Sequence, residues 1–228
     1  MEISIIALPL LASIVSGFFG KLIGDRNSEI VTSLLVTISA ILSALILYKV
    51  IFNQYQDNII ISTWISSGTL DVNWSMKIDP LSAIMLVVVT SVSSLVHIYS
   101  IGYMSHDPHK PRFMAYLSLF TFAMLMLVTS DNFIQLFFGW EGVGLCSYFL
   151  IGFWFKKDTA NVAAIKAFLV NRVGDFGFAL GIFLIFYLFG TVNYSEVFEL
   201  IPTIIDKNLI FLGIDINAID LICLLLFV

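Results

Sequence analysis

Long apolar runs are the feature that most constrains the fold of this chain. Seven of them cover most of its 228 residues: Ile3–Phe19, Ile30–Phe52, Leu81–Tyr103, Phe113–Ser130, Phe133–Phe155, Ala160–Phe189 and Leu209–Val228. A helix of about 20 residues crosses the ~30 Å hydrocarbon core of a bilayer. The sequence is 59% hydrophobic and 12% charged, and it lacks the two-residue alternation of a membrane barrel. We therefore expect an all-α polytopic membrane protein with about six to seven transmembrane helices.

The connections between these segments are mostly short. The longest is polar and runs over residues 53–80, where two alternating stretches flank Gly68. This pattern predicts an external β-hairpin between the second and third helices. The link Asp131–Asn132 is barely a turn, so the fourth and fifth helices should be antiparallel neighbours. The seventh segment contains Asp215, Asn217 and Asp220 and reaches Val228 without a polar tail, which suggests a truncated sequence.

Basic residues mark one side of the membrane. The first, third and fifth connections carry six of them: Lys21, Arg26, Lys110, Arg112, Lys156 and Lys157. Loops rich in lysine and arginine stay on the cytoplasmic or matrix side, so the N-terminus is expected on the opposite side. No basic patch of the kind that binds nucleic acid is present, and we expect no nucleic-acid partner. The expected partner of the apolar surface is the lipid bilayer.

Glu141 is a carboxylate deep inside an apolar segment. The segment extends eight residues before it, to Phe133, and fourteen after it, to Phe155. A charge near the centre of a membrane helix costs about 2.5–3.5 kcal/mol on insertion scales. Such a residue needs a proton, an ion or a buried partner.

Possible partners lie in the sixth segment. Arg172 and Asp175 are three residues apart, so they share a helix face and can pair. Lys166 lies about 14 Å along the axis from Asp175 and on roughly the opposite face, where its side chain can reach the basic interface. Two alternatives remain open for Glu141, Arg172 and Asp175. They form either a static ion cluster that fixes two helices in register or a titrating proton relay.

His97 is a further candidate, in the third segment. Thr90, Ser94 and His97 follow one another at positions i, i+4 and i+7, which places them in a polar stripe. The stripe indicates either interhelical hydrogen bonding or a branch that takes up protons, because histidine titrates near neutral pH. Gly139, Gly142 and Gly144 do not follow a strand, so close helix packing is favoured over a phosphate-binding loop.

Several motifs resemble one family. These are IDPLSAIM (78–85), LVHIYSIGYM (95–104), DNFIQLFFGWEG (131–142), FFGWEGVGLCSYFLIGFW (137–154) and KAFLVNRVGDFGFALG (166–181). Together they resemble the antiporter-like chain 5, or subunit L, of the proton-translocating NADH:quinone oxidoreductase, respiratory complex I. The resemblance covers nearly the whole chain and fits its N-terminal portion.

The resemblance implies an antiporter-like helical bundle built from inverted five-helix repeats with broken helices. It also implies a glutamate on the fifth helix, matched by Glu141, paired with a lysine beyond Val228. His97, Lys166, Arg172 and Asp175 match positions around the family's channel. On this basis residues 1–130 hold helices one to four with the external hairpin 53–80. Residues 131–228 then begin the proton-channel repeat, in truncated form.

The function implied by the resemblance is proton translocation coupled to quinone reduction. The chain would then be a subunit of an enzyme and carry no redox site of its own. NADH, FMN, iron–sulfur clusters and quinone are expected in the parent complex, and other membrane subunits are the expected protein partners. The implied location is a bacterial inner membrane or, alternatively, the mitochondrial inner membrane. A subunit of an Mrp-type sodium/proton antiporter and a non-transporting structural fragment are the alternative functions.

Overall fold

The computed structural model describes residues 1–68, 70–211 and 213–227. Six helices in this part of the chain are long and apolar enough, by length and composition, to cross a membrane. They are α1 (Glu2–Ile23), α2 (Asp25–Asn53), α3 (Pro80–Tyr103), α4 (Lys110–Val128), α5 (Phe133–Ile151) and α6 (Asp158–Phe189). The prediction of a polytopic helical bundle with about six to seven spans is confirmed.

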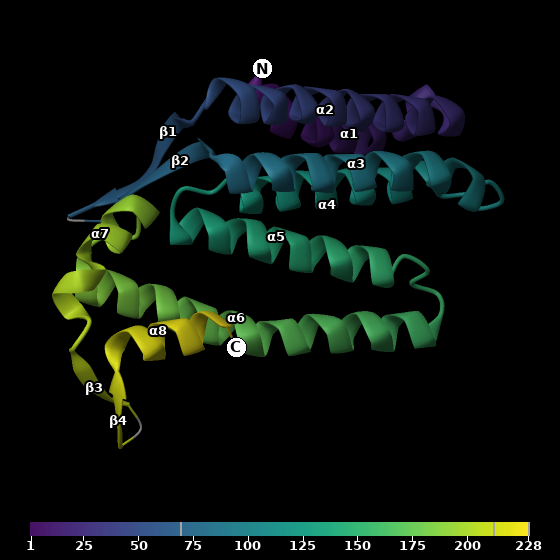
Figure 1. Ribbon diagram of the computed structural model, residues 1–228. Coiled ribbons are helices and arrows are strands. Elements are labelled where there is room, and N and C mark those ends of the chain that lie inside the picture. The colour runs from purple at the N-terminus through teal and green to yellow at the C-terminus, as the bar shows by residue number, and fades with distance from the viewer. Residues whose placement is uncertain (69, 212, 228) are drawn as a thin grey trace.

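The long helices lie side by side and roughly parallel to one common direction (Figure 1). Helices α1 to α4 form a compact group in which α4 packs against α1, α2 and α3. Helix α5 packs on α4, and α6 packs on α5. The expected neighbour relation between α4 and α5 is therefore confirmed, and α5 joins the four-helix group to α6.

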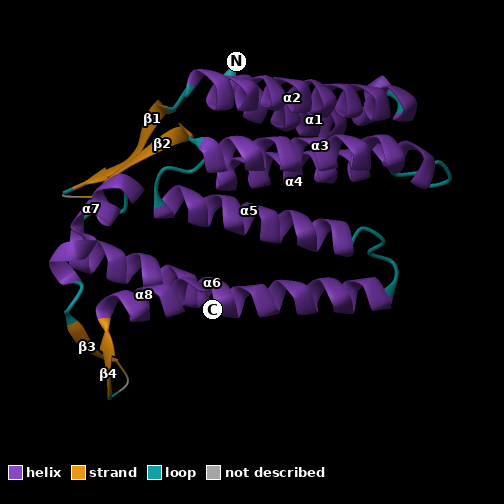
Figure 2. Cartoon of the chain, viewed as in Figure 1, coloured by secondary structure: helices purple, strands orange, loops and turns teal. Residues whose placement is uncertain are grey.

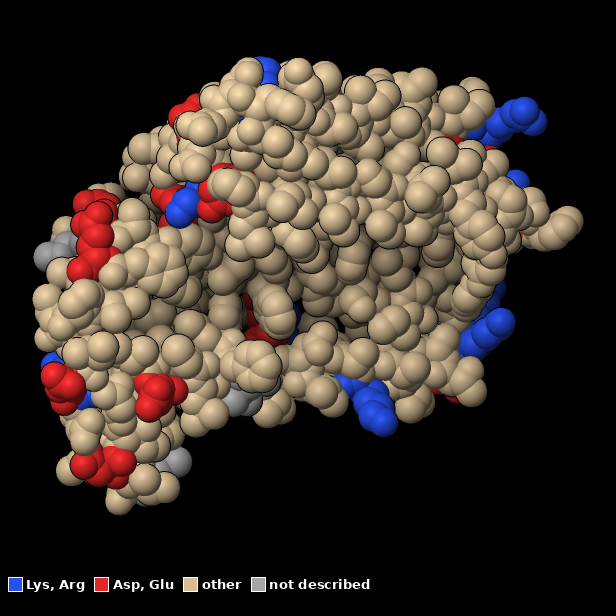
Figure 3. Space-filling model, viewed as in Figure 1, with Lys and Arg blue, Asp and Glu red and all other residues tan. Residues whose placement is uncertain are grey.

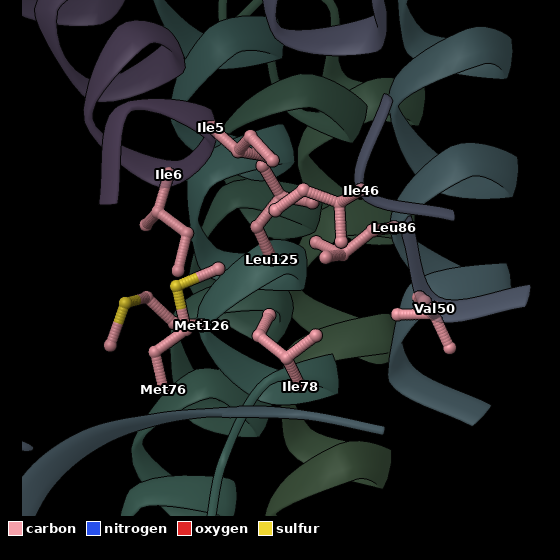
Figure 4. Packing of buried hydrophobic residues seen from close by; sticks show 10 residues of the cluster. Ile5, Ile6, Ile46, Val50, Met76, Ile78, Leu86, Leu125 and Met126 are labelled. Atoms are coloured by element: carbon pink, nitrogen blue, oxygen red, sulfur yellow. The ribbon is translucent and has the colours of Figure 1, made fainter. Parts of the chain in front are cut away.

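The group of α1 to α4 encloses an apolar core at the end of the bundle near the N-terminus. Figure 4 shows Ile5 and Ile6 of α1 close to Leu125 and Met126 of α4, with Ile46 of α2 opposite. Side chains from the hairpin strand β2 (Leu70–Ile78) close the lower edge of this cluster. Hydrophobic packing therefore fixes the hairpin to the helices.

The external hairpin between α2 and α3 is confirmed. Strand β1 (Asp57–Ser67) pairs antiparallel with β2, and Gly68 follows β1 with a positive φ of 62°. The Gln135 side chain ties the hairpin to α5, since it accepts from the Ser75 amide at 3.0 Å and donates to the Ser75 carbonyl at 2.7 Å. All the strands lie at one end of the bundle (Figure 2).

The last predicted apolar segment, Leu209–Val228, is interrupted near Asp215 and Asn217, as its sequence indicated, and positions 212 and 228 lie outside the described residues. Its first half lies in a second hairpin of β3 (Asn208–Phe211) and β4 (Ile214–Asn217), followed by α8 (Ala218–Phe227). Asn208 pairs with Asn217 across this hairpin, and Gly213 has a positive φ of 83°. The short helix α7 (Tyr194–Ile204) was not predicted. Helix α8 packs back against α6.

Charge separates along the bundle. Figure 3 shows acidic side chains concentrated at one end of the molecule, whereas the other end shows mainly lysine and arginine side chains among its charged groups. The basic end holds the α3–α4 and α5–α6 connections (Figure 1). Figure 3 also shows acidic and basic atoms inside a hollow in the middle of this face, away from both ends.

Candidate functional site

Three charged side chains meet between α5 and α6. Glu141 lies on α5, and Arg172 and Asp175 lie one turn apart on α6. Arg172 Nη1 donates to Glu141 Oε2 and lies 3.5 Å from Asp175 Oδ2. The structure therefore brings together all three residues that the sequence selected, and one guanidinium bridges two carboxylates.

Asp175 is the most enclosed member of this cluster. Its side chain is 9% exposed, whereas the side chains of Glu141 and Arg172 are 23% and 41% exposed. Trp140 Nε1, on α5, donates to Asp175 Oδ1 at 2.9 Å. The two oxygens of Asp175 thus face different donors, one from each helix, as buried carboxylates require.

Close packing of α5 on α4 sets the position of this cluster. A Cβ atom at Gly139 would lie 2.7 Å from the backbone of Leu127, and one at Gly142 would lie 3.0 Å from the Ala123 Cβ. Only glycine at position 139 lets α5 approach α4 so closely. The interpretation of these two glycines as packing residues is confirmed.

Lys166 does not join the cluster. It is exposed on α6, and no ion pair links it to any residue that the structure describes. Its place, two turns before Arg172 toward the basic end, agrees with the expected outward direction.

His97 lies in a second polar group, formed by α3 and α4. The ring is fully buried. Its Nδ1 contacts the Ser93 carbonyl oxygen at 2.8 Å, and its Nε2 contacts Ser118 Oγ at 3.0 Å. Because a carbonyl only accepts, Nδ1 carries a proton, and in the neutral form of the ring Nε2 accepts from the Ser118 hydroxyl.

Neighbouring hydroxyls extend this group. Ser93 Oγ lies 2.5 Å from Thr121 Oγ1, and Ser94 Oγ lies 2.7 Å from Thr37 Oγ1 on α2. Thr90, by contrast, donates to the Leu86 carbonyl of its own helix at 2.6 Å. The predicted stripe therefore divides, and Ser94 and His97 form the interhelical contacts.

The two polar groups are separate. His97 faces α4, whereas Glu141 reaches α6 from the far side of α4. No hydrogen bond between described residues connects them. Among these residues there is also no cluster of three or more His, Cys, Asp or Glu side chains that could hold a metal ion.

Four contributors were not predicted from the sequence: Trp140, Ser118, Thr121 and Thr37. Ser118 and Thr121 could have been predicted, because they are polar residues three positions apart in an apolar helix and so share a face. Trp140 could not have been predicted, because its contact with Asp175 depends on which faces of α5 and α6 meet.

Two family models match most of the chain. One, described as NADH-Ubiquinone oxidoreductase (complex I), chain 5 N-terminus, matches residues 64–114. The other, described as NADH:quinone oxidoreductase/Mrp antiporter, TM, matches residues 130–228.

Curated relatives carry corresponding names. The NADH-ubiquinone oxidoreductase chain 5 of Arabidopsis thaliana is 54% identical over 228 residues, which is 100% of this chain and 34% of that protein. The NADH-quinone oxidoreductase subunit L of Rickettsia bellii is 48% identical over 100% of this chain and 36% of its own length. The chain therefore spans about one third of the length of these relatives.

Two solved structures share the fold. The membrane-bound sulfane sulfur reductase, an archaeal respiratory membrane complex, superimposes with a TM-score of 0.76 at 18% identity, covering 88% of this chain and 40% of the other. The Mrp complex from Dietzia sp. DQ12-45-1b gives a TM-score of 0.71 at 22% identity, covering 85% of this chain and 20% of the other.

Proposed function

Because this chain belongs to the antiporter-like family of NADH:quinone oxidoreductase membrane subunits known as chain 5 or subunit L, we propose that it forms part of a proton-translocating subunit of that complex. The observation that carries the proposal is the bridge from Arg172 to Glu141 and Asp175 within the membrane-spanning helices. The chain then acts as part of a translocase in an inner membrane, bacterial or mitochondrial.

The cluster has the charge balance of a proton acceptor. Two carboxylates share one guanidinium, so the group holds one excess negative charge when all three side chains are ionised. In a low-dielectric setting such an excess favours uptake of one proton. Glu141 is the carboxylate that accepts it, because Asp175 has a second donor in Trp140.

The other candidates have supporting roles in this proposal. Arg172 holds the two carboxylates, Asp175 anchors Arg172, and His97 loads protons from a separate group. Lys166 supplies positive charge toward the basic side. Movement of charge elsewhere in the complex opens or closes the Arg172–Glu141 pair and so changes the proton affinity of Glu141.

The remaining parts of the reaction belong to partners. Binding of NADH, FMN, iron–sulfur clusters and quinone is assigned to other subunits, and this chain contacts lipid and neighbouring membrane subunits. Within it, residues 1–130 supply the first four helices and the hairpin 53–80. Residues 131–228 begin the channel repeat that contains Glu141, Arg172 and Asp175.

A sodium/proton antiporter subunit is the second candidate. It is favoured by the description of the family model over residues 130–228, which includes the Mrp antiporter. Purification of the full-length protein with its neighbours separates the two functions. Recovery with quinone-reducing subunits supports the first function, whereas sodium-dependent proton flux without electron transfer supports the second.

A third alternative is a purely structural cluster. Replacing Glu141, Arg172 and Asp175 together by Leu, Met and Leu in the full-length subunit tests it, because such sets are often exchanged for apolar residues without loss of stability. We expect an assembled complex that transfers electrons and translocates fewer protons. Full proton translocation by the assembled triple variant would contradict our proposal.

A further inference from the structure

One face of α2 carries a polar stripe that the ion cluster does not use. Glu29, Ser33 and Thr37 follow one another at intervals of four residues, so they lie along one side of the helix. The stripe starts one turn inside the basic end of α2 and extends about 12 Å toward the membrane centre. It ends at Thr37, whose hydroxyl contacts Ser94 of α3 at 2.7 Å.

The outer part of this stripe is buried and lacks protein partners. Glu29 is 5% exposed and Ser33 is 7% exposed, and the adjacent Ser28 is fully buried. Glu29 Oε1, Ser28 Oγ and Ser33 Oγ have no hydrogen bond to any described residue. A buried polar group without a partner is destabilising, and bound water is the usual way to satisfy it.

Glu29 opens into a cavity at the basic end of the bundle. The cavity has a volume of about 410 Å³ and lies between α2, the end of α3 and the start of α4. Its lining consists of Arg26, Glu29, Ile30, Ile101, Ser105 and Lys110. The volume exceeds by far the ~30 Å³ share of one water molecule in the liquid, and the charged lining attracts water.

We propose that the cavity and the α2 stripe form a water-filled proton-access path from the basic side to His97. Glu29 receives a proton from a hydronium ion in the cavity, which leaves a water molecule. The proton then passes through water beside Ser33 to the Thr37–Ser94 pair. Ser94 and His97 are three residues apart on α3. Water carries the proton from Ser94 to Nε2, the ring nitrogen that faces Ser118 of α4.

The charged side chains around Glu29 are consistent with an entrance to a proton path. Lys110 from α4 and Arg26 from α2 share its cavity, and Asp25 lies in the same turn of α2. These groups keep the carboxylate from being an isolated buried charge, while its unpaired oxygen leaves room for a proton. This path rests on the proposed proton translocation and assigns it a second entry, distinct from Glu141.

Three changes in the full-length subunit, assembled in its complex, test the path by function. They are Glu29→Gln, Ser33→Ala and the pair Thr37→Val with Ser94→Ala. Each should lower the number of protons translocated per electron while leaving electron transfer intact. Thr32→Val is the matched control, because Thr32 is buried on the same helix and its hydroxyl contacts only carbonyls of α2. If Thr32→Val lowered proton translocation as much as the other changes do, a specific path would be contradicted.

Direct observation of water provides a second test that does not depend on folding of the variants. A map of the wild-type complex that resolves ordered water should show density within hydrogen-bonding distance of Glu29 Oε1 and Ser33 Oγ. A dry space between α2 and α3 would overturn the path.

Glu141→Gln, measured in parallel, separates this inference from the proposed function. If Glu141→Gln lowers proton translocation and Glu29→Gln does not, the access path is wrong and the proposed function stands. If neither change has an effect, both are wrong. Lower proton translocation by Glu29→Gln, together with ordered water along the stripe, supports the path.

Discussion

The Arg172 guanidinium on α6 donates to the Glu141 carboxylate on α5 and thereby joins two membrane-spanning helices. The same guanidinium nitrogen lies 3.5 Å from Asp175. One arginine therefore compensates two acids, and its loss leaves both without their cation.

Replacement of Arg172 by methionine tests this dependence. Breaking a fully buried ion pair by removing one partner costs about 3–5 kcal/mol, whereas an exposed pair contributes about 0–1 kcal/mol. The Arg172 side chain is 41% exposed, so the expected loss lies between these two ranges. The thermal midpoint of the complex that contains the full-length subunit should be lower for Arg172→Met than for wild type. The decrease should be smaller for Arg172→Lys, because the positive charge is kept. Equal midpoints for Arg172→Met and wild type would contradict a compensating role.

Trp140→Phe removes one donor from Asp175 and keeps an aromatic ring. A hydrogen bond to a charged group contributes about 1.5–3 kcal/mol, so the variant should be measurably less stable to heat. Trp154→Phe is the control, because Trp154 Nε1 donates at 2.8 Å to Asp107 in the exposed α3–α4 connection. We expect a smaller decrease in thermal midpoint for Trp154→Phe than for Trp140→Phe. A larger decrease for Trp154→Phe would argue against the Trp140–Asp175 contact.

Gly139→Ala should push α5 away from α4. The added Cβ would lie 2.7 Å from the Leu127 backbone, a distance that the helices must increase, and overpacking of this kind costs about 1–3 kcal/mol. Gly102→Ala on α3 meets no heavy atom within 4 Å and should not destabilise the protein, because alanine favours a helix more than glycine does. The yield of assembled complex after detergent extraction measures both variants.

The buried phenol of Tyr194, on α7, should make the stability of the folded protein depend on pH. Burial raises the pKa of its phenol to about 12, the Ser130 hydroxyl acts in the opposite direction, and the Asp131 charge adds to the increase. The neutral phenol is thus favoured in the folded state. This stability is present below the unfolded pKa near 10 and is lost as the pH rises toward 12.

Tyr194→Phe cannot ionise and should lack this alkaline loss. The difference in thermal midpoint between wild type and variant should therefore change between pH 9 and about pH 11, with the wild type losing more. A constant difference over this range would show that Tyr194 does not titrate differently on unfolding.

Hydropathy and turn chemistry are local properties, and they predicted much of this fold. The six long helices and the hairpin around Gly68 follow from the residues within each segment. The second hairpin, within Leu209–Val228, could not be predicted in this way, because an apolar window does not reveal that Asp215 and Asn217 lie in a strand paired with Asn208–Phe211.

The site was predicted less completely than the fold. Spacing on one helix correctly placed Arg172 beside Asp175. The contact from Trp140 to Asp175 and the contact from Thr37 to Ser94 depend on how neighbouring helices rotate and pack. A single sequence does not specify these rotations, so contacts between distant segments required the structure.

Proton translocation by a Glu141→Gln variant tests the central claim most directly. The full-length subunit, assembled in its complex and reconstituted in sealed vesicles, is measured for protons moved per electron transferred. Glutamine keeps the shape of the side chain and can still accept from Arg172, but it cannot take up a proton. We predict an assembled, electron-transferring complex with a marked loss of proton translocation, and a wild-type ratio of protons to electrons would contradict the account.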